Sequence, residues 1–145
     1  MSYTPPPAPR DLEAQRARFP VAAIEELVHT FYGQVREDAV LGPIFARRID
    51  AWPPHLARMV TFWRSVLRSE PAFTASPRGN PRALHARIEE LQLAHFDRWL
   101  GLFRKTAERV WAEDPAAAAE VTRRARRIAR TLAGDVRARA GGARP

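Results

Sequence analysis

The chain has 145 residues, of which 46% are hydrophobic and 28% are charged, and its formal net charge is +8. This composition is typical of one folded domain and not of a disordered chain. The absence of cysteine excludes disulfides, thiolate zinc sites, iron–sulfur clusters and thiolate-ligated haem, so a bound metal would need His, Asp, Glu, Met or Tyr ligands.

No apolar run is long enough to span a bilayer, and the chain does not begin with a secretory signal. We therefore expect a cytoplasmic protein with no membrane partner. The positive charge comes almost entirely from arginine. Such a balance can indicate a nucleic-acid or anionic-membrane partner, but a coding preference for Ala, Arg and Pro explains it more simply unless the arginines line one face.

The chain is predicted to contain one folded domain between two flexible ends. Residues 1–17 are expected to form a Pro-rich tail, because four prolines fall within the first ten positions. The domain is expected over residues 18–140, and residues 141–145 form the second flexible end. Helical periodicity accounts for the domain, and no segment alternates long enough to predict a strand. The predicted fold class is therefore all-α.

The first half of the domain predicts three helical segments. A helix over 20–37 begins with a proline in its first turn and carries an apolar stripe. A short helical turn is expected at 43–49. A third helix should begin after Trp52, where two prolines suit a first turn, and run to about Leu67.

The second half begins with a Pro-, Ser- and Gly-rich loop over 69–81, followed by helices at about 82–90, 93–113 and 115–139. The last helix has an apolar stripe with arginines off it, so its basic side is expected to be solvated. This weakens the nucleic-acid interpretation without removing it. The sequence also contains no basic patch interleaved with aromatic residues, and no zinc-finger spacing.

The sequence contains no Gly-rich phosphate loop, nucleophile elbow, HExxH pair or EF-hand loop. What remains is a set of polar side chains on apolar helix faces. Taken singly, a histidine in such a place is usually a structural residue, and a tyrosine or tryptophan usually belongs to the core. Together, they also suit a flat apolar cofactor held by one imidazole, with polar groups on its other side. The candidates are Tyr32, His55, His85, His95 and Trp99.

Four segments, in this order, resemble the third group of the truncated haemoglobins. They are 31-FYGQVREDAVLGPIF-45, 55-HLARMVTFW-63, 79-GNPRALH-85 and 95-HFDRWLGLF-103. The resemblance extends from about Ile24 to about Ala133. It implies a globin-like fold, a truncated two-over-two helical sandwich, with haem b (iron protoporphyrin IX) between its helix pairs.

The resemblance also implies a role for each candidate. His85 matches the proximal histidine and is the expected iron ligand, whereas His95 matches a position without a ligand role. Tyr32, His55 and Trp99 match polar residues of the distal pocket, where they could contribute to catalysis. The expected haem contacts, besides His85, are Phe45, Met59, Phe62, Trp63, Ile88 and Trp99.

A protein of this kind would bind dioxygen, NO or CO reversibly. Three distal donors would hold dioxygen firmly, which favours NO dioxygenation or peroxidase-like chemistry over storage. Whether the protein is an enzyme stays open. NO dioxygenation would require a separate reductase, because no flavin or nicotinamide domain is evident in the chain. No nucleic-acid partner is expected, although the alternative is a small basic helical module that binds nucleic acid or an anionic surface.

Overall fold

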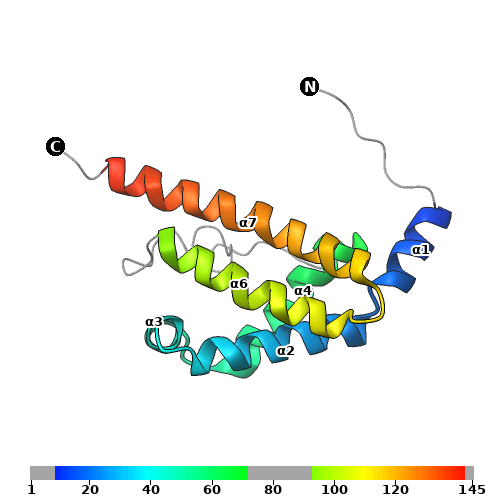
Figure 1. The fold of residues 1–145 in the computed structure, drawn as a ribbon, viewed down its shortest axis with the longest axis horizontal. Coiled ribbons are helices and arrows are strands. Elements are labelled where there is room, and N and C mark those ends of the chain that lie inside the picture. The colour runs from blue at the N-terminus through cyan, green and yellow to red at the C-terminus, as the bar shows by residue number, and fades with distance from the viewer. Residues whose placement is uncertain (1–8, 72–92, 143–145) are drawn as a thin grey trace.

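The computed structural model describes residues 9–71 and 93–142, and every regular element within them is a helix (Figure 1). This confirms the predicted all-α class. The expected helix at 82–90 and most of the loop at 69–81 lie outside the described residues. The helices are α1 (Pro9–Arg18), α2 (Val21–Glu37), α3 (Leu41–Arg48), α4 (Trp52–Arg68), α6 (Leu93–Val110) and α7 (Pro115–Gly142).

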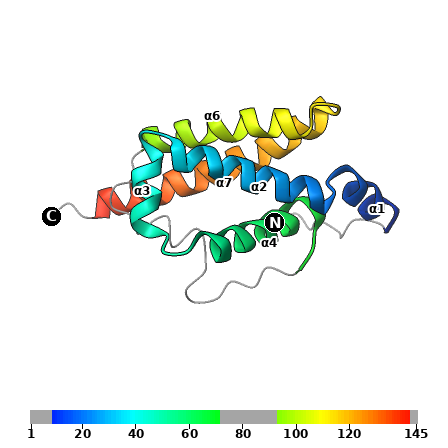
Figure 2. The same cartoon turned by 90° about the horizontal axis from the view of Figure 1, so that it is seen from below.

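The helices form two antiparallel pairs, α2 with α4 and α6 with α7 (Figures 1 and 2). Helix α2 packs against both α4 and α6, so it joins the two pairs, and the short α3 packs against α2. This arrangement confirms the predicted globin-like, two-over-two sandwich. None of the described helices has the length and apolar character needed to cross a membrane.

The core follows from the apolar stripes, because residues three and four positions apart lie on one face of a helix. Phe103 of α6 is 1% exposed and lies at the centre of this core. Its ring centroid is 5.2 Å from that of Phe31, 4.9 Å from that of Trp63 and 5.4 Å from that of Trp99. Complete burial of such a side chain contributes about 2–3 kcal/mol, so these contacts between α2, α4 and α6 stabilise the sandwich substantially.

Helix α1 corrects the expectation of a flexible tail over residues 1–17, since the chain is helical from Pro9. A proline is compatible with a first helical turn, and the Glu, Ala, Gln and Arg residues that follow favour helix. The end of α1 is held by α4. The Arg68 guanidinium donates 2.9 Å hydrogen bonds to the carbonyls of Arg16 and Phe19, and Gln15 Nε2 donates to a carbonyl of α4 at 2.7 Å. At the other end, α7 continues to Gly142, beyond the expected limit at residue 140.

Asp38 links the turn between α2 and α3 to α6. Its Oδ1 accepts hydrogen bonds from the backbone N–H groups of Val40 at 2.9 Å and Leu41 at 2.8 Å. The Arg98 Nε atom donates to the same carboxylate at 2.7 Å. The Arg98 hydrogen bond and the two backbone bonds favour the ionised form, and they lower the pKa of Asp38 to about 2, from an ordinary value of 3.8.

Asp38→Asn is expected to lower the free energy of unfolding at neutral pH by about 1–2 kcal/mol, measured by urea denaturation. Asparagine keeps an Oδ1 acceptor for the two backbone N–H groups, so the loss comes from the carboxylate charge that strengthens those bonds, with a smaller part from the pair with Arg98, which is 47% exposed and screened by solvent. Since the pKa is lower in the folded state, this stabilisation is complete above about pH 4 and is lost as the pH falls towards 2. The exposed Asp50 supplies the control, Asp50→Asn, and an equal loss in both variants would refute the account.

Gly42, in the first turn of α3, is buried against α2. A Cβ atom at this position would lie 2.7 Å from the backbone oxygen of Arg36, closer than a side chain tolerates. Gly42→Ala is therefore expected to lower the free energy of unfolding by about 1–3 kcal/mol.

Gly101 of α6 provides a matched control, because a Cβ added there would meet no atom within 4 Å. Gly101→Ala should raise the free energy of unfolding by about 0.5–1 kcal/mol through its helix propensity. Denaturation curves of the two variants that shift in the same direction would argue against the close approach of α3 to α2.

Candidate functional site

Phe31 and Tyr32 are neighbours on α2 whose side chains are both buried but lie against different helices. Successive helical residues point about 100° apart, so the pair serves two sides of α2. The Phe31 ring lies 5.3 Å from that of Trp99 on α6, and the Tyr32 ring lies 5.0 Å from that of His55 on α4. The structure thus brings together the three distal candidates of the sequence around one turn of α2.

Trp52 completes this arrangement, and sequence reasoning missed it. Its ring lies 5.6 Å from that of His55 and 6.0 Å from that of Tyr32. The available signal was its spacing, because residues three apart share a helix face. The Arg36 guanidinium lies 4.6 Å from the Trp52 ring centroid, a cation–π contact that holds this tryptophan against α2. We call Tyr32, Trp52 and His55 the aromatic cluster.

The polar atoms in and beside the cluster are suited to donating hydrogen bonds. Burial raises the pKa of the Tyr32 phenol, so the hydroxyl stays protonated at neutral pH. The indole of Trp99 can only donate, and the imidazole of His55 can donate or accept. The Nε2 atom of His55 is buried. Tyr32 and His55 therefore place two polar groups side by side between α2 and α4 that could donate to a partly negative ligand.

The other predicted cofactor contacts are distributed around this cluster. Phe45 is buried on α3 with its ring 6.3 Å from that of Tyr32, and Met59 is buried one turn after His55. Phe62 is half-buried, whereas Trp63 is buried and stacked on Phe103 in the core.

Three further histidine and apolar positions complete the prediction. The predicted iron ligand His85 and the predicted contact Ile88 lie outside the described residues. His95 is half-buried in the first turn of α6.

The described part of the candidate site fits a haem group. A neutral phenol, an imidazole and an indole lie among aromatic and apolar side chains, which suits a flat apolar cofactor with a polar ligand on one face. Two pockets of about 430 and 440 Å³ lie elsewhere, between α6 and α7, and none of the predicted site residues lines them. We assign the candidate site to the aromatic cluster, because the cluster contains predicted site residues and the two pockets contain none of them.

No protein-family model matches the chain. Comparisons with curated proteins and with solved structures, however, both find a group III truncated haemoglobin. The group 3 truncated haemoglobin ctb of Campylobacter jejuni is 31% identical over 96 residues, which is 63% of this chain and 72% of that protein. The crystal structure of a group III truncated haemoglobin from Campylobacter jejuni superposes with a TM-score of 0.70 at 28% identity. The match covers 80% of this chain and 90% of that one.

The helical sandwich, with the aromatic cluster between α2 and α4, defines a globin-like protein. The similarity to known proteins identifies the family more specifically than the fold does. This chain belongs to the group III truncated haemoglobin family and is a globin-type haem protein.

Proposed function

We propose that the protein holds haem b through His85 and binds dioxygen, NO or CO reversibly beside the aromatic cluster. The observation that carries the proposal is the 5.0 Å approach of the Tyr32 and His55 rings, in a fold that belongs to a haem-protein family. The role of His85 rests on its position in the family motif. The haem, when bound, supplies an iron that takes one diatomic ligand.

The chain's own residues determine how firmly that ligand is held. The protonated Tyr32 hydroxyl and the Trp99 indole N–H can each donate a hydrogen bond to a partly negative ligand atom. Trp52 and Tyr32 pack against the His55 ring and fix its orientation. His55 can then hold or move a proton at Nε2. The surrounding apolar side chains exclude water, which strengthens each of these hydrogen bonds.

Firm retention of dioxygen favours chemistry on the ligand, so we further propose NO dioxygenation as the reaction, with peroxidase-like turnover of peroxide as the alternative. NO dioxygenation consumes an electron in each cycle. The protein would therefore act with a separate reductase.

Rapid mixing of the ferrous protein with each gas tests the proposal. We expect reversible dioxygen and CO complexes, with slow dioxygen release, and we expect nitrate when the oxygenated protein meets NO. A ferrous protein that forms no dioxygen complex would refute gas binding as proposed here. A stable dioxygen complex that yields no nitrate with NO would refute dioxygenation alone.

A further inference from the structure

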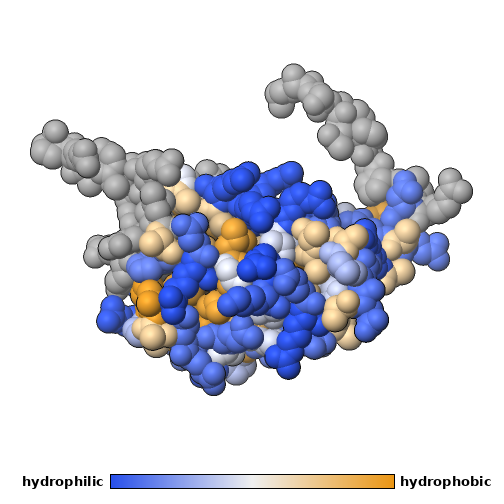
Figure 3. Space-filling view, in the orientation of Figure 1, coloured by the Kyte–Doolittle hydropathy of each residue, from blue (hydrophilic) through white to orange (hydrophobic). Residues whose placement is uncertain are grey.

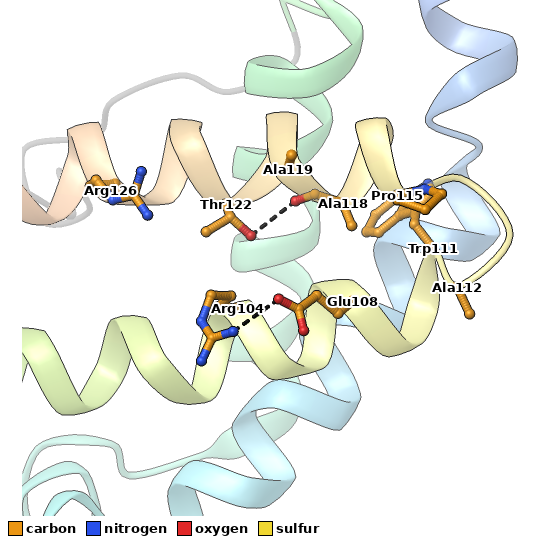
Figure 4. A pocket seen from close by; sticks show the side chains of 9 residues that line it. All are labelled: Arg104, Glu108, Trp111, Ala112, Pro115, Ala118, Ala119, Thr122 and Arg126. Atoms are coloured by element: carbon orange, nitrogen blue, oxygen red, sulfur yellow. Dashed lines mark hydrogen bonds and ion pairs between the residues drawn. The ribbon is translucent and has the colours of Figure 1, made fainter.

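A groove runs between α6 and α7. It consists of the two pockets described above, which share Arg126. The residues of α7 that line the groove are mostly alanines, which occur on successive turns of the helix. In the first pocket, Arg104 of α6 and Thr122 of α7 face each other (Figure 4). The floor of the second half is formed by Phe96 and Leu100 of α6. Small residues leave space that the two helices do not fill themselves.

Arginines border this groove, and several of them are not neutralised. Glu120 forms ion pairs with Arg123 and Arg124 within α7. By contrast, the described residues provide no ion pair for a second group of exposed arginines on the same helix. Figure 3 shows hydrophilic side chains on both sides of paler apolar residues near the turn that joins α6 and α7. The unneutralised group is Arg126, Arg127 and Arg130.

We infer that this groove docks an acidic electron-donor protein, which reduces the iron of the proposed function. Charge complementarity identifies the partner, because Arg126 and Arg130 line the groove without an ion pair among the described residues and the whole chain carries +8. The apolar floor offers contact area for side chains of the partner. With haem bound as proposed, the reduced partner would lose one electron and the iron would gain it, changing from ferric to ferrous.

The position of the groove suits this role. Leu100 lies on the groove side of α6, whereas the neighbouring Trp99 packs against Phe31 beside the aromatic cluster. Since Leu100 and Trp99 are successive residues, a partner seated over Phe96 and Leu100 would lie beside the turn of α6 that carries Trp99. The identity of the partner as an electron donor rests on the proposed function.

Two other occupants fit the groove less well. A second copy of this chain would present the same positive charge and be repelled. Single-stranded nucleic acid would gain from exposed aromatic rings for base stacking, but the one large hydrophobic side chain found exposed in the described residues is Val40.

Flavodoxin, a small acidic electron-transfer protein, serves as the probe. Calorimetric titration of the ferric holoprotein measures its affinity, and stopped-flow mixing with reduced flavodoxin measures the rate of iron reduction. The test variant is Arg126→Gln/Arg130→Gln, and the control is Lys105→Gln/Arg109→Gln on α6, which removes the same charge from exposed residues that do not line the groove. Glutamine keeps a high helix propensity, and circular dichroism verifies the fold.

We expect the test variant to bind flavodoxin about ten-fold more weakly and to be reduced more slowly, with the control within about two-fold of the wild type. Binding should also weaken as salt rises from about 20 to 200 mM. Equal losses in both variants, or no binding at low salt, would overturn the inference. Duplex DNA that binds more tightly than flavodoxin, with the same dependence on Arg126 and Arg130, would replace it by a nucleic-acid site. A protein without a Soret band contradicts the proposed function, whereas a normal Soret band without flavodoxin binding contradicts the docking inference alone.

Discussion

His85→Ala is expected to abolish stable haem binding, because the family motif makes His85 the protein's iron ligand and the chain has no cysteine to replace it. Under the proposed function the aromatic cluster would add only hydrogen bonds and apolar contact, which alone would leave the haem weakly held. The measurement is the Soret absorbance of the purified variant after reconstitution with haemin and gel filtration.

His95→Ala is the matched control, since His95 is half-buried in the first turn of α6 and has no ligand role in the motif. This variant should keep one haem per chain. A Soret band that survives in the His85 variant and disappears in the His95 variant would show that His95, and not His85, is the iron ligand.

Tyr32→Phe and Trp99→Phe should each accelerate dioxygen release by about 10- to 100-fold, corresponding to the loss of one hydrogen bond to a partly negative ligand at about 1.5–3 kcal/mol. Both substitutions keep an aromatic ring in the core, where Phe31 contacts both Tyr32 and Trp99. Stopped-flow measurement of dioxygen dissociation provides the rates. CO dissociation should change much less, because bound CO carries less negative charge.

Trp111→Phe is the control for the tryptophan substitution. The Trp111 indole donates to the Arg18 carbonyl at 3.2 Å, at the contact between α1 and the end of α6. This variant should lose some stability but keep the wild-type rate of dioxygen release. If neither Tyr32→Phe nor Trp99→Phe changes that rate, the donors do not hold the ligand and the distal assignment is wrong.

Local sequence patterns predicted most of the fold. The stripe on α2 and the prolines at the start of α4 determined the helices to within a few residues, because periodicity and proline geometry act locally. The docking of α1 on α4 could not be predicted, since it depends on hydrogen bonds from Gln15 and Arg68 that join residues about 50 positions apart. No local pattern contains that information.

The candidate site likewise has residues that the sequence identifies and residues that only tertiary contacts reveal. Tyr32, His55 and Trp99 could be named from the family motif, and the structure places them around one turn of α2. The three-residue spacing of Trp52 from His55 indicates only a shared helix face, because its importance comes from the packing of α4 against α2 and from its contact with Arg36. Tertiary contacts of this kind lie outside the reach of helical periodicity.

The central claim is that this chain holds haem, and the absorption spectrum of the purified protein tests it most directly. We predict one haem per chain, with a Soret band that shifts when the ferrous protein is exposed to CO. A colourless protein that takes up no haemin, but binds duplex DNA with steep salt dependence, would contradict the account and favour a small basic nucleic-acid-binding module.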